Sequence, residues 1–384
     1  MQQFDVIVVG GGMVGASVAL KLAHSGLQVA LVERQTPAVY QAQQPLDLRV
    51  SAINQRSERW LTELGAWSLL QQWRLCPYRR LQAFEGDTPG LTFTADELNL
   101  SHLGHIVENS LIQQALWQQF PEQLTVFSPA TVTGFSQQQA LAQLTTKEFG
   151  CLSAQLVIAA DGGQSQLRQF AGIGSTGWMY QQACLVLEVD TELPQQDITW
   201  QQFHPTGPRA MLPLSGHKAS LVWYDAHQKV QQLAALSLPE LSRQVQAAFP
   251  AKLGAVQVTR CAWFPLARNH ANSYAKGRLV LVGDAAHSIN PLAGQGVNLG
   301  FADARVLCEV LLSANTGALA SAELLARYEK ERRRANALMM SAMDGFYQLF
   351  SNELPPLKLA RQLGLTLAER AGPLKRLVSR YAVL

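Results

Sequence analysis

A glycine-rich turn near the start of the chain constrains its fold more than any other feature. The stretch VGGGMVGASVAL, residues 9–20, holds Gly10, Gly12 and Gly15 in the pattern GxGxxG. A glycine inside a helix or strand costs ~0.5–1 kcal/mol relative to alanine, so an apolar segment that keeps several of them needs a reason. The apolar run before the turn predicts a buried parallel strand, and the run after it predicts a helix. The glycines then lie at the turn of a βαβ unit, which predicts an α/β protein.

The ligand that such a turn accepts is a dinucleotide. Gly10 permits the tight turn, Gly12 lets a pyrophosphate approach the backbone, and Gly15 lets the helix pack closely on the strand. The helix N-terminus adds unpaired N–H groups and the positive end of its dipole. The next predicted strand ends at Glu33, whose carboxylate can accept hydrogen bonds from a ribose. The alternative for the glycines alone is a turn that serves only helix packing.

Two later stretches repeat an apolar strand followed by a turn that suits a ligand. LVIAADGGQSQLR, residues 156–168, ends its strand at Asp161, and RLVLVGDAAHSINPLAGQGVNLG, residues 278–300, passes Asp284 into a glycine-rich loop. In a parallel sheet the carboxyl ends of the strands meet at one edge. The Asp284 carboxylate is suited to accept a hydrogen bond from a ribitol hydroxyl. The glycine-rich loop and the helix that follows it can face the pyrimidine side of an isoalloxazine. We therefore expect FAD, although each turn alone can be an ordinary one.

The chain is long enough for two domains or for one domain with a large insertion. Between residues 174 and 270, short β-branched and aromatic runs alternate with turn residues, which predicts a mostly antiparallel sheet. The expected fold class is α/β with an α+β substrate insertion and C-terminal helices. Its parts are a Rossmann-like FAD-binding domain (1–173 and 271–325), a mostly β-sheet substrate domain (174–270) and a C-terminal helical region (326–384).

The inserted sheet is expected to form the far wall of a substrate cavity. Its large apolar side chains can line that cavity, with core packing as the alternative for each: Trp200, Phe203, Met211, Leu214, Trp223 and Tyr224. His204, His217 and Tyr224 are conceivable bases for a ring hydroxyl, but lone histidines in a β domain are more often structural. The catalytic residue is therefore left unassigned.

Charge and cysteine content narrow the class of protein. A net charge of +3 is too weak to indicate nucleic acid as a partner. The five cysteines show no CxxC pair or metal-ligand spacing, so we expect a cytoplasmic protein with reduced thiols and no metal site. No apolar run is long enough to span a bilayer. The basic, apolar C-terminal segments allow peripheral contact with the inner face of the membrane, with packing on the FAD domain as the favoured alternative.

The chain resembles the flavoprotein monooxygenases related to para-hydroxybenzoate hydroxylase. The GxGxxG turn, Asp161-Gly162 with Ser165 and Arg168, and GDAAHSINPLAGQGVNLG carry this resemblance. Within the family it is most similar to the aromatic-ring hydroxylases of ubiquinone biosynthesis, in the group that acts on a polyprenyl methyl-methoxy-benzoquinol. The segments that carry this closer likeness are PYRRL, VENSLIQQALWQ, WQQF, ASLVWYD, LPPL and AERAG. The resemblance implies ring hydroxylation by O₂ through a flavin C4a-hydroperoxide, with NAD(P)H as a transient reductant.

The resemblance also implies which residues hold FAD. Those expected at the pyrophosphate and the adenosine are Gly10, Gly12, Met13, Val14, Gly15, Glu33, Arg34 and Val132. Those expected at the ribitol chain and the flavin are Arg49, Asn109, Asp161, Asp284, Pro291, Gly296, Val297 and Asn298. Asn109 stands where relatives usually carry Arg or Gln, so its shorter side chain changes that contact.

Two other functions stay open at the level of the sequence. A flavin-dependent dehydrogenase without oxygen insertion would carry the same first turn, and so would a non-enzymatic FAD-binding subunit of a quinone-biosynthesis assembly. The expected partners are a polyprenyl benzoquinol and O₂. For protein contacts, a ubiquinone-biosynthesis complex and a homo-oligomer both remain open.

Overall fold

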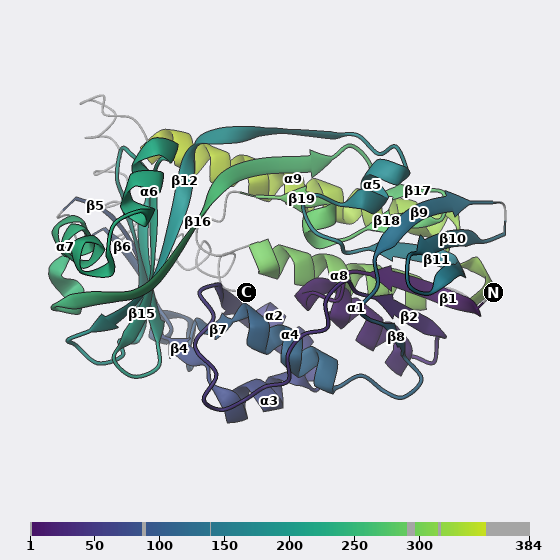
Figure 1. The fold of residues 1–384 in the computed structure, drawn as a ribbon, viewed down its shortest axis with the longest axis horizontal. Helices are drawn as coiled ribbons and strands as arrows, with labels where there is room; N and C mark the ends of the chain where they lie inside the picture. The colour runs from purple at the N-terminus through teal and green to yellow at the C-terminus, as the bar shows by residue number, and fades with distance from the viewer. Residues whose placement is uncertain (1, 87–89, 139, 290–295, 314–315, 351–384) are drawn as a thin grey trace.

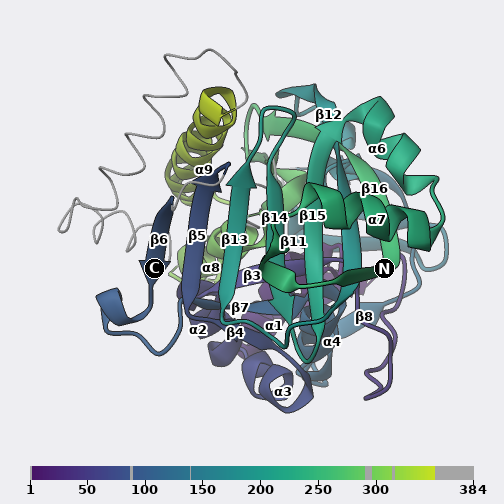
Figure 2. The same ribbon diagram turned by 90° about the vertical axis from the view of Figure 1, so that its left-hand side faces the viewer.

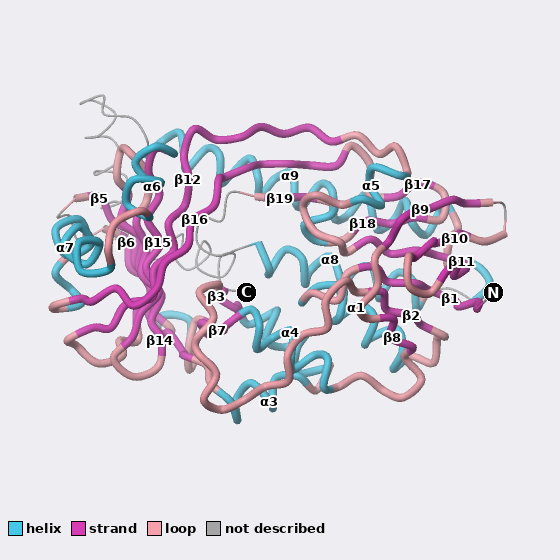
Figure 3. Tube along the Cα trace, in the orientation of Figure 1, coloured by secondary structure: helices cyan, strands magenta, loops and turns pink. Residues whose placement is uncertain are grey.

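The computed structural model describes residues 2–86, 90–138, 140–289, 296–313 and 316–350. Figure 1 shows an elongated molecule with two lobes, one of which begins with strand β1 (Gln2–Val9). The two longest strands, β12 (Ser175–Thr191) and β16 (Val256–Ala271), run from one lobe to the other (Figures 1 and 3). This strand pair therefore connects the two lobes.

A mostly parallel sheet forms the core of the first lobe. Its order is β17 (Ala275–Lys276), β18 (Leu279–Leu281), β11 (Gly150–Ala159), β1, β2 (Val29–Val32) and β8 (Thr125–Phe127), and β10 (Ala142–Thr146) with β9 (Val132–Gln137) extends it from β11. Strands β18, β11, β1, β2 and β8 run parallel, whereas β17, β10 and β9 pair antiparallel. Strand β2 reads VALV and is buried throughout, as expected for a parallel strand covered on both faces.

Helices pack on this sheet and on one another. They are α1 (Met13–His24), α4 (Asn109–Gln118), α5 (Gln166–Phe170), α8 (Gly296–Leu312) and α9 (Ala322–Phe350). Helix α1 contacts both α4 and α8, and α8 contacts α9. Helix α9 is the described part of the expected C-terminal helical region, whose residues 351–384 lie outside the described residues. Among the helices of the described ranges, none combines the length and apolar character needed to cross a bilayer.

The second lobe holds a large and mostly antiparallel sheet. Its order is β19 (His287–Ser288), β16, β12, β15 (Lys218–Ala226), β14 (Arg209–Leu214), β13 (Ile198–Phe203), β5 (Arg80–Glu85) and β6 (Leu91–Thr94). Helices α6 (His227–Ala234) and α7 (Leu238–Ala248) lie on one face of it (Figure 2). This arrangement confirms the expected α/β fold with a mostly antiparallel second sheet. The domain boundaries stay a prediction, and the sheet takes in β5 and β6 from outside residues 174–270.

A small third sheet lies between the two lobes (Figure 3). It consists of β3 (Val50–Asn54), β7 (Gly104–Glu108) and β4 (Cys76–Tyr78), and α2 (Gln55–Glu63) and α3 (Ala66–Trp73) follow β3. Short 3-10 helices complete the described elements: η1 (Asp96–Leu98), η2 (Ala251–Leu253), η3 (Gly283–Ala285) and η5 (Thr316–Ala318).

The two faces of the large sheet bury different side chains. Trp200, Met211 and Trp223 pack in the core that includes residues of α6 and α7, so for these three the packing alternative is correct. Tyr224 lies in a cluster with Cys184, because neighbouring residues of a strand point to opposite faces. Tyr224 therefore lies on the face of the sheet opposite α6 and α7.

Candidate cofactor cleft

The turn between β1 and α1 has no room for side chains. A Cβ added to Gly10, whose φ is +102°, would lie 2.3 Å from the Ala160 carbonyl oxygen, and one added to Gly15 would lie 1.9 Å from the Gly10 carbonyl oxygen. Gly12 faces open space, with nothing within 4 Å of an added Cβ. It also caps α1 without a side-chain hydrogen bond. The first N–H groups of α1 are thus presented to a space that a phosphate can fill.

Gly11, which the sequence analysis did not select, joins this turn to the end of β2. Its N–H donates a short hydrogen bond to the Glu33 carboxylate. Its carbonyl oxygen accepts from Gln113 Nε2 and Trp117 Nε1, both at 2.8 Å. An added Cβ would lie 2.6 Å from the Trp117 ring. The run of three glycines was the only sequence signal for this residue, and its consequence is that Glu33 is held beside the turn.

The adenosine-end candidates lie around Glu33. The Ala130 N–H donates to the Glu33 carbonyl oxygen at 2.8 Å, which brings the segment leading to Val132 alongside the end of β2. Val132 is half-buried and Arg34 is exposed. Three chain segments therefore meet where an adenosine is expected.

The second turn abuts the first. Gly10 packs against the backbone of Ala160 and Asp161. The Oδ2 atom of Asp161 accepts from the Leu167 N–H at 3.2 Å, while its buried Oδ1 has no hydrogen-bond partner within the described residues. Arg168 donates to the Ala285 carbonyl oxygen at 2.7 Å and so ties this turn to the third. A buried acceptor without a donor points to a group that the chain does not itself supply.

The third turn packs on the start of α1. Added Cβ atoms on Gly283 and Gly300 would lie 3.2 and 2.6 Å from Val14, so η3, α8 and α1 meet around that side chain. The Asp284 side chain is exposed to solvent. The protein atoms packed around its carboxyl nevertheless raise its pKa, and the charges of His287 and Arg49 lower it by a smaller amount. A carboxylate that solvent reaches although protein surrounds it lies in a cleft. The structure thus brings all three predicted turns to one place.

A buried carboxylate behind this cleft holds the third turn in position. Asp303 is 0% exposed and accepts hydrogen bonds from the Gly283 N–H at 3.2 Å, from Arg332 Nε at 2.7 Å, from Asn336 Nδ2 at 3.0 Å and from His287. Burial alone would raise the pKa of Asp303, but His287 and Arg332 outweigh it and lower the pKa. Asp303 was missed at the sequence level, where an acidic residue in the apolar run of α8 was the only sign.

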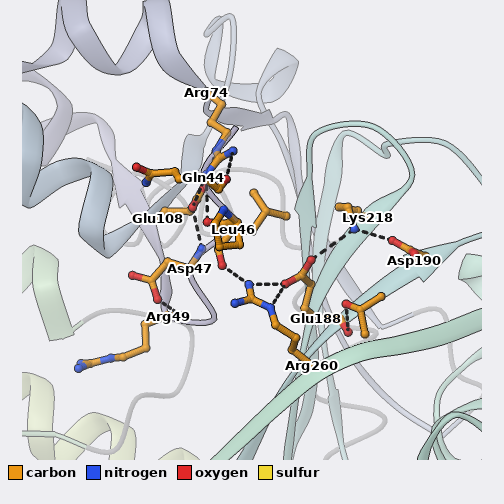
Figure 4. Close-up of polar contacts among 12 residues, drawn as sticks. Gln44, Leu46, Asp47, Arg49, Arg74, Glu108, Glu188, Asp190, Lys218 and Arg260 are labelled. Carbon is orange, nitrogen blue, oxygen red and sulfur yellow. Dashed lines mark hydrogen bonds and ion pairs between the residues drawn. The ribbon is translucent and has the colours of Figure 1, made fainter. Parts of the chain in front are cut away.

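Arg49 stands at the end of a tightly held loop, residues 44–49 (Figure 4). Glu108 accepts from the Asp47 N–H at 2.7 Å and from Arg74 Nε at 2.7 Å. The Asn109 N–H donates to the Arg49 carbonyl oxygen at 2.9 Å. Figure 4 shows the Arg49 side chain directed away from these contacts. It is exposed and close enough to Asp284 to lower the pKa of that carboxyl.

The same loop is joined to the second lobe by Arg260 of β16. Its guanidinium donates to Glu188 through Nε at 2.8 Å and makes a short bond to the Leu46 carbonyl oxygen (Figure 4). Lys218 contacts the other oxygen of Glu188 at 3.3 Å and Asp190 at 2.6 Å. One guanidinium thus connects the large sheet to the segment that carries Arg49.

Two predicted flavin contacts use their side chains within the protein. The Asn298 amide accepts from Asn54 N–H at 3.2 Å and from Ser57 Oγ at 2.7 Å, and it donates to the Ala52 carbonyl oxygen at 2.8 Å. Asn109 Oδ1 accepts from Ser51 Oγ at 2.7 Å. The Asn298 amide oxygen and one of its two N–H groups are therefore engaged within the protein.

The remaining predicted residues lie at the start of α8 and α1. Gly296 and Val297 are half-buried at the first residues of α8, and Met13 is half-buried at the start of α1. Pro291 lies outside the described residues. With the side-chain-free first turn, the orphaned Asp161 oxygen and Asp284 in the cleft, the residues present fit FAD.

The conceivable bases do not gather at this cleft. His204 contacts Thr206 at 3.1 Å, and His217 contacts the Thr191 carbonyl oxygen at 3.2 Å. Burial raises the pKa of Tyr224 well above its usual value, so its hydroxyl keeps its proton at neutral pH. The geometry assigns no catalytic base.

Comparisons with known proteins indicate an FAD-binding domain. A family model described as "FAD binding domain" matches residues 3–342. The chain is 45% identical over 386 residues to the "3-demethoxyubiquinol 3-hydroxylase" of Escherichia coli strain K12, covering 100% of this chain and 99% of the relative. It is 36% identical to the "Ubiquinone hydroxylase UbiL" of Rhodospirillum rubrum, covering 99% and 89%. It is 31% identical to the mitochondrial "Ubiquinone biosynthesis monooxygenase COQ6" of Homo sapiens, covering 99% and 92%.

Solved structures share the fold at low sequence identity. The p-nitrophenol 4-monooxygenase PnpA of Pseudomonas putida DLL-E4 matches with a TM-score of 0.81 at 20% identity, covering 99% of this chain and 97% of that one. PqsL of Pseudomonas aeruginosa, described as a probable FAD-dependent monooxygenase, matches with a TM-score of 0.77 at 19% identity, covering 91% and 97%.

Proposed function

The chain belongs to the family of FAD-dependent hydroxylases of ubiquinone biosynthesis, and we propose that its own substrate is a polyprenyl methyl-methoxy-benzoquinol, hydroxylated on the ring with O₂. The observation that carries this proposal is the 45% identity, along the full length, to a relative named for hydroxylation of 3-demethoxyubiquinol. The cleft supports it because the three turns that suit FAD meet, and the segment after the third turn, β19, pairs with β16 of the large sheet.

Reduced FAD, when bound, supplies the electrons that activate O₂. In this proposal the chain binds and orients the cofactor. The N–H groups that follow Gly12 bind the pyrophosphate, Glu33 accepts from the ribose, and Asp284 accepts from the ribitol. The charge of Arg49 lowers the pKa of Asp284, so in this proposal Arg49 keeps a positive charge near the cofactor. The other predicted cofactor contacts are proposed with the roles given above.

The large sheet supplies the dry wall of the substrate site. On the face opposite α6 and α7, Cys184, Tyr224 and Leu266 form an apolar cluster, joined by Val186 and Val222. Such a surface excludes water from the reacting groups and suits an aromatic ring. Because Tyr224 keeps its proton, its role in this proposal is to orient the ring rather than to deprotonate it.

We also propose that NAD(P)H reduces the flavin by a transient visit. The sequence carries one GxGxxG turn, which this proposal assigns to FAD, so no second turn of this kind is left for NAD(P)H. Rapid mixing of the oxidised holoenzyme with NADH or NADPH tests this step. Bleaching of the flavin absorbance that is faster with quinol substrate present supports it, and an unreactive flavin contradicts it.

Exposed apolar side chains on β12 and β16 support contact with the membrane that holds a polyprenylated substrate. Trp178, Met179, Trp263 and Phe264 are 46%, 62%, 38% and 39% exposed. Aromatic side chains are favoured at membrane–water interfaces. We therefore propose a cytoplasmic protein that binds the membrane peripherally. Sedimentation with anionic vesicles tests this binding. Elution as an oligomer, or with proteins of a biosynthetic complex, and no binding to vesicles would instead favour a protein contact.

The substrate is tested by mass spectrometry of quinones in a strain that lacks this protein. Accumulation of the polyprenyl methyl-methoxy-benzoquinol supports the proposal. Accumulation of a different precursor would contradict it and would identify that precursor as the substrate. Turnover of the purified holoenzyme with ¹⁸O₂ then tests the reaction. Label in the product ring supports hydroxylation. Product without label would indicate a dehydrogenase, and no turnover would indicate a non-enzymatic subunit.

A further inference from the structure

We propose that Glu58, His102 and His105 form a binding site for a divalent transition-metal ion, with Zn²⁺ as the best match, outside the cofactor cleft. Glu58 lies on α2, His105 lies on β7, and His102 lies in the turn that leads into β7. Helix α2 and strand β7 are near one another in Figure 1. This site plays no part in the proposed hydroxylation.

The three ligand atoms have the spacing that a metal requires. Glu58 Oε2 lies 2.9 Å from His102 Nε2 and 3.2 Å from His105 Nδ1, and all three atoms lie within 4.8 Å of one another. Ligands ~2.0–2.1 Å from a tetrahedral Zn²⁺ are about 3.3 Å apart, so an ion can enter with small side-chain shifts. Two histidines and one glutamate are a known zinc ligand set that leaves a fourth position for water.

The surroundings of the histidines fit metal ligands. His102 Nδ1 lies 2.8 Å from Ser101 Oγ, so it can donate its N–H there while Nε2 binds the ion. Ligand histidines usually use their second nitrogen in this way, which fixes the tautomer and the ring. The His105 ring packs edge-on against Trp67, with centroids 5.1 Å apart. Both rings are therefore held in place before an ion arrives.

The carboxylate is ready to bind. Glu58 Oε2 already contacts His102 Nε2 and His105 Nδ1, so this oxygen faces the position that an ion would take. The side chains of Glu58, His102 and His105 are 20%, 19% and 11% exposed, which keeps the site partly dry and still open to solvent.

The position of the site points to a structural role next to the cofactor cleft. Ser57, beside Glu58 on α2, hydrogen-bonds Asn298 at the start of α8. Strand β7, which carries His105, ends at Glu108, the residue that holds the loop of Arg49. An ion at this site would therefore fix α2 to β7 between two elements that form the cleft.

The test uses the FAD-loaded, full-length protein freed of metal with a chelator. Calorimetric titration with Zn²⁺ alone is expected to show one bound ion per chain, and Co²⁺ is expected to give the visible absorption bands of a site with nitrogen and oxygen ligands. Glu58→Gln and His102→Asn are each expected to weaken Zn²⁺ binding by more than about tenfold. Glu63→Gln, on the same helix, is the matched control and is expected to bind as the wild type does.

Three outcomes would overturn the proposal: wild-type protein that binds no Zn²⁺, equal binding by Glu58→Gln and Glu63→Gln, or a sulfur-to-Co²⁺ charge-transfer band, which would place the ion on a free cysteine. Thermal unfolding gives a second readout, because a ligand of the folded state raises Tm. The rise with Zn²⁺ is expected in the wild type and in Glu63→Gln only.

Discussion

Asp303 has no exposed surface, and four hydrogen-bond donors point at its carboxylate. Two of them, Arg332 and His287, belong to α9 and to the segment after η3, so this one residue joins a helix to the third turn of the cleft. A buried charge is stable only when such partners surround it. At the scale of residues, the cleft therefore depends on a group that does not itself face it.

Asp303→Asn is expected to destabilise the protein by about 3 kcal/mol, because the Arg332 guanidinium loses its buried counter-charge. Urea unfolding of the FAD-free protein measures the change. Glu309→Gln, on the same helix and in an exposed pair with Arg305, is the control and is expected to cost less than about 1 kcal/mol. Equal losses in the two variants would show that Asp303 has no special role.

Glu58 gives a pH dependence with a definite sign. Its pKa falls from 4.5 to about 2 on folding, so its contribution to the free energy of unfolding is present above about pH 4.5 and is lost as the pH falls toward 2. With a chelator present, wild-type protein should lose stability over this range more steeply than Glu58→Gln. Parallel profiles in acid unfolding would contradict this expectation, and Glu63→Gln should follow the wild type.

At the scale of elements, close contact between backbones decides the shape of the cleft. Helix α1 starts against β1 because Gly15 leaves no Cβ between them, and α8 reaches η3 because Gly300 and Gly283 leave room for Val14. Helix α2 is fixed to α8 through Ser57 and Asn298. In the first two contacts the elements approach closely because a glycine has no side chain. In the third, a hydrogen bond between two polar side chains connects the helices.

Gly15→Ala is expected to push α1 away from β1, since the new Cβ would lie 1.9 Å from the Gly10 carbonyl oxygen. We expect the affinity for FAD to fall by more than about tenfold, because the helix N-terminus then no longer meets the pyrophosphate. Fluorescence titration of the apoprotein with FAD measures it. Gly26→Ala, at the far end of α1, has open space around the Cβ but a φ of +88°, so it controls for strain without contact.

At the scale of the whole molecule, the two lobes are joined by the β12–β16 strand pair and by side chains that reach from this pair to other segments of the chain. Arg260 is one of these side chains, because it reaches from β16 to the Leu46 carbonyl oxygen while it pairs with Glu188. The loop it holds ends at Arg49, whose charge lowers the pKa of Asp284. The position of the sheet and the charge near the cofactor are therefore linked.

Arg260→Gln is expected to increase hydrogen exchange in residues 44–49, because the loop loses its contact with the second lobe. Lys218→Gln removes the other cation from Glu188 but leaves the Leu46 contact in place, so it is the matched control. Exchange measured by mass spectrometry should rise in the first variant alone. A similar rise in both would show that the charge of Glu188, rather than the bridge, orders the loop.

The sequence by itself determined the first βαβ unit, the FAD cofactor and the family. These depend on local causes: glycine where a Cβ cannot fit, as at Gly10 and Gly15, and the continuous apolar runs of buried strands such as β2. A short motif carries such information because the residues that act together are neighbours in the chain.

Only the tertiary structure determined which residues that lie far apart in the sequence interact with one another. His102 and Glu58 are 44 positions apart, and Arg332 and Asp303 are 29 positions apart. Strands β5 and β6 belong to the large sheet although they lie outside the range that was predicted for it. The Asn298 amide hydrogen-bonds to residues of β3 and α2. Such contacts form when whole elements pack, and no local period or turn records which distant side chain will meet a buried charge.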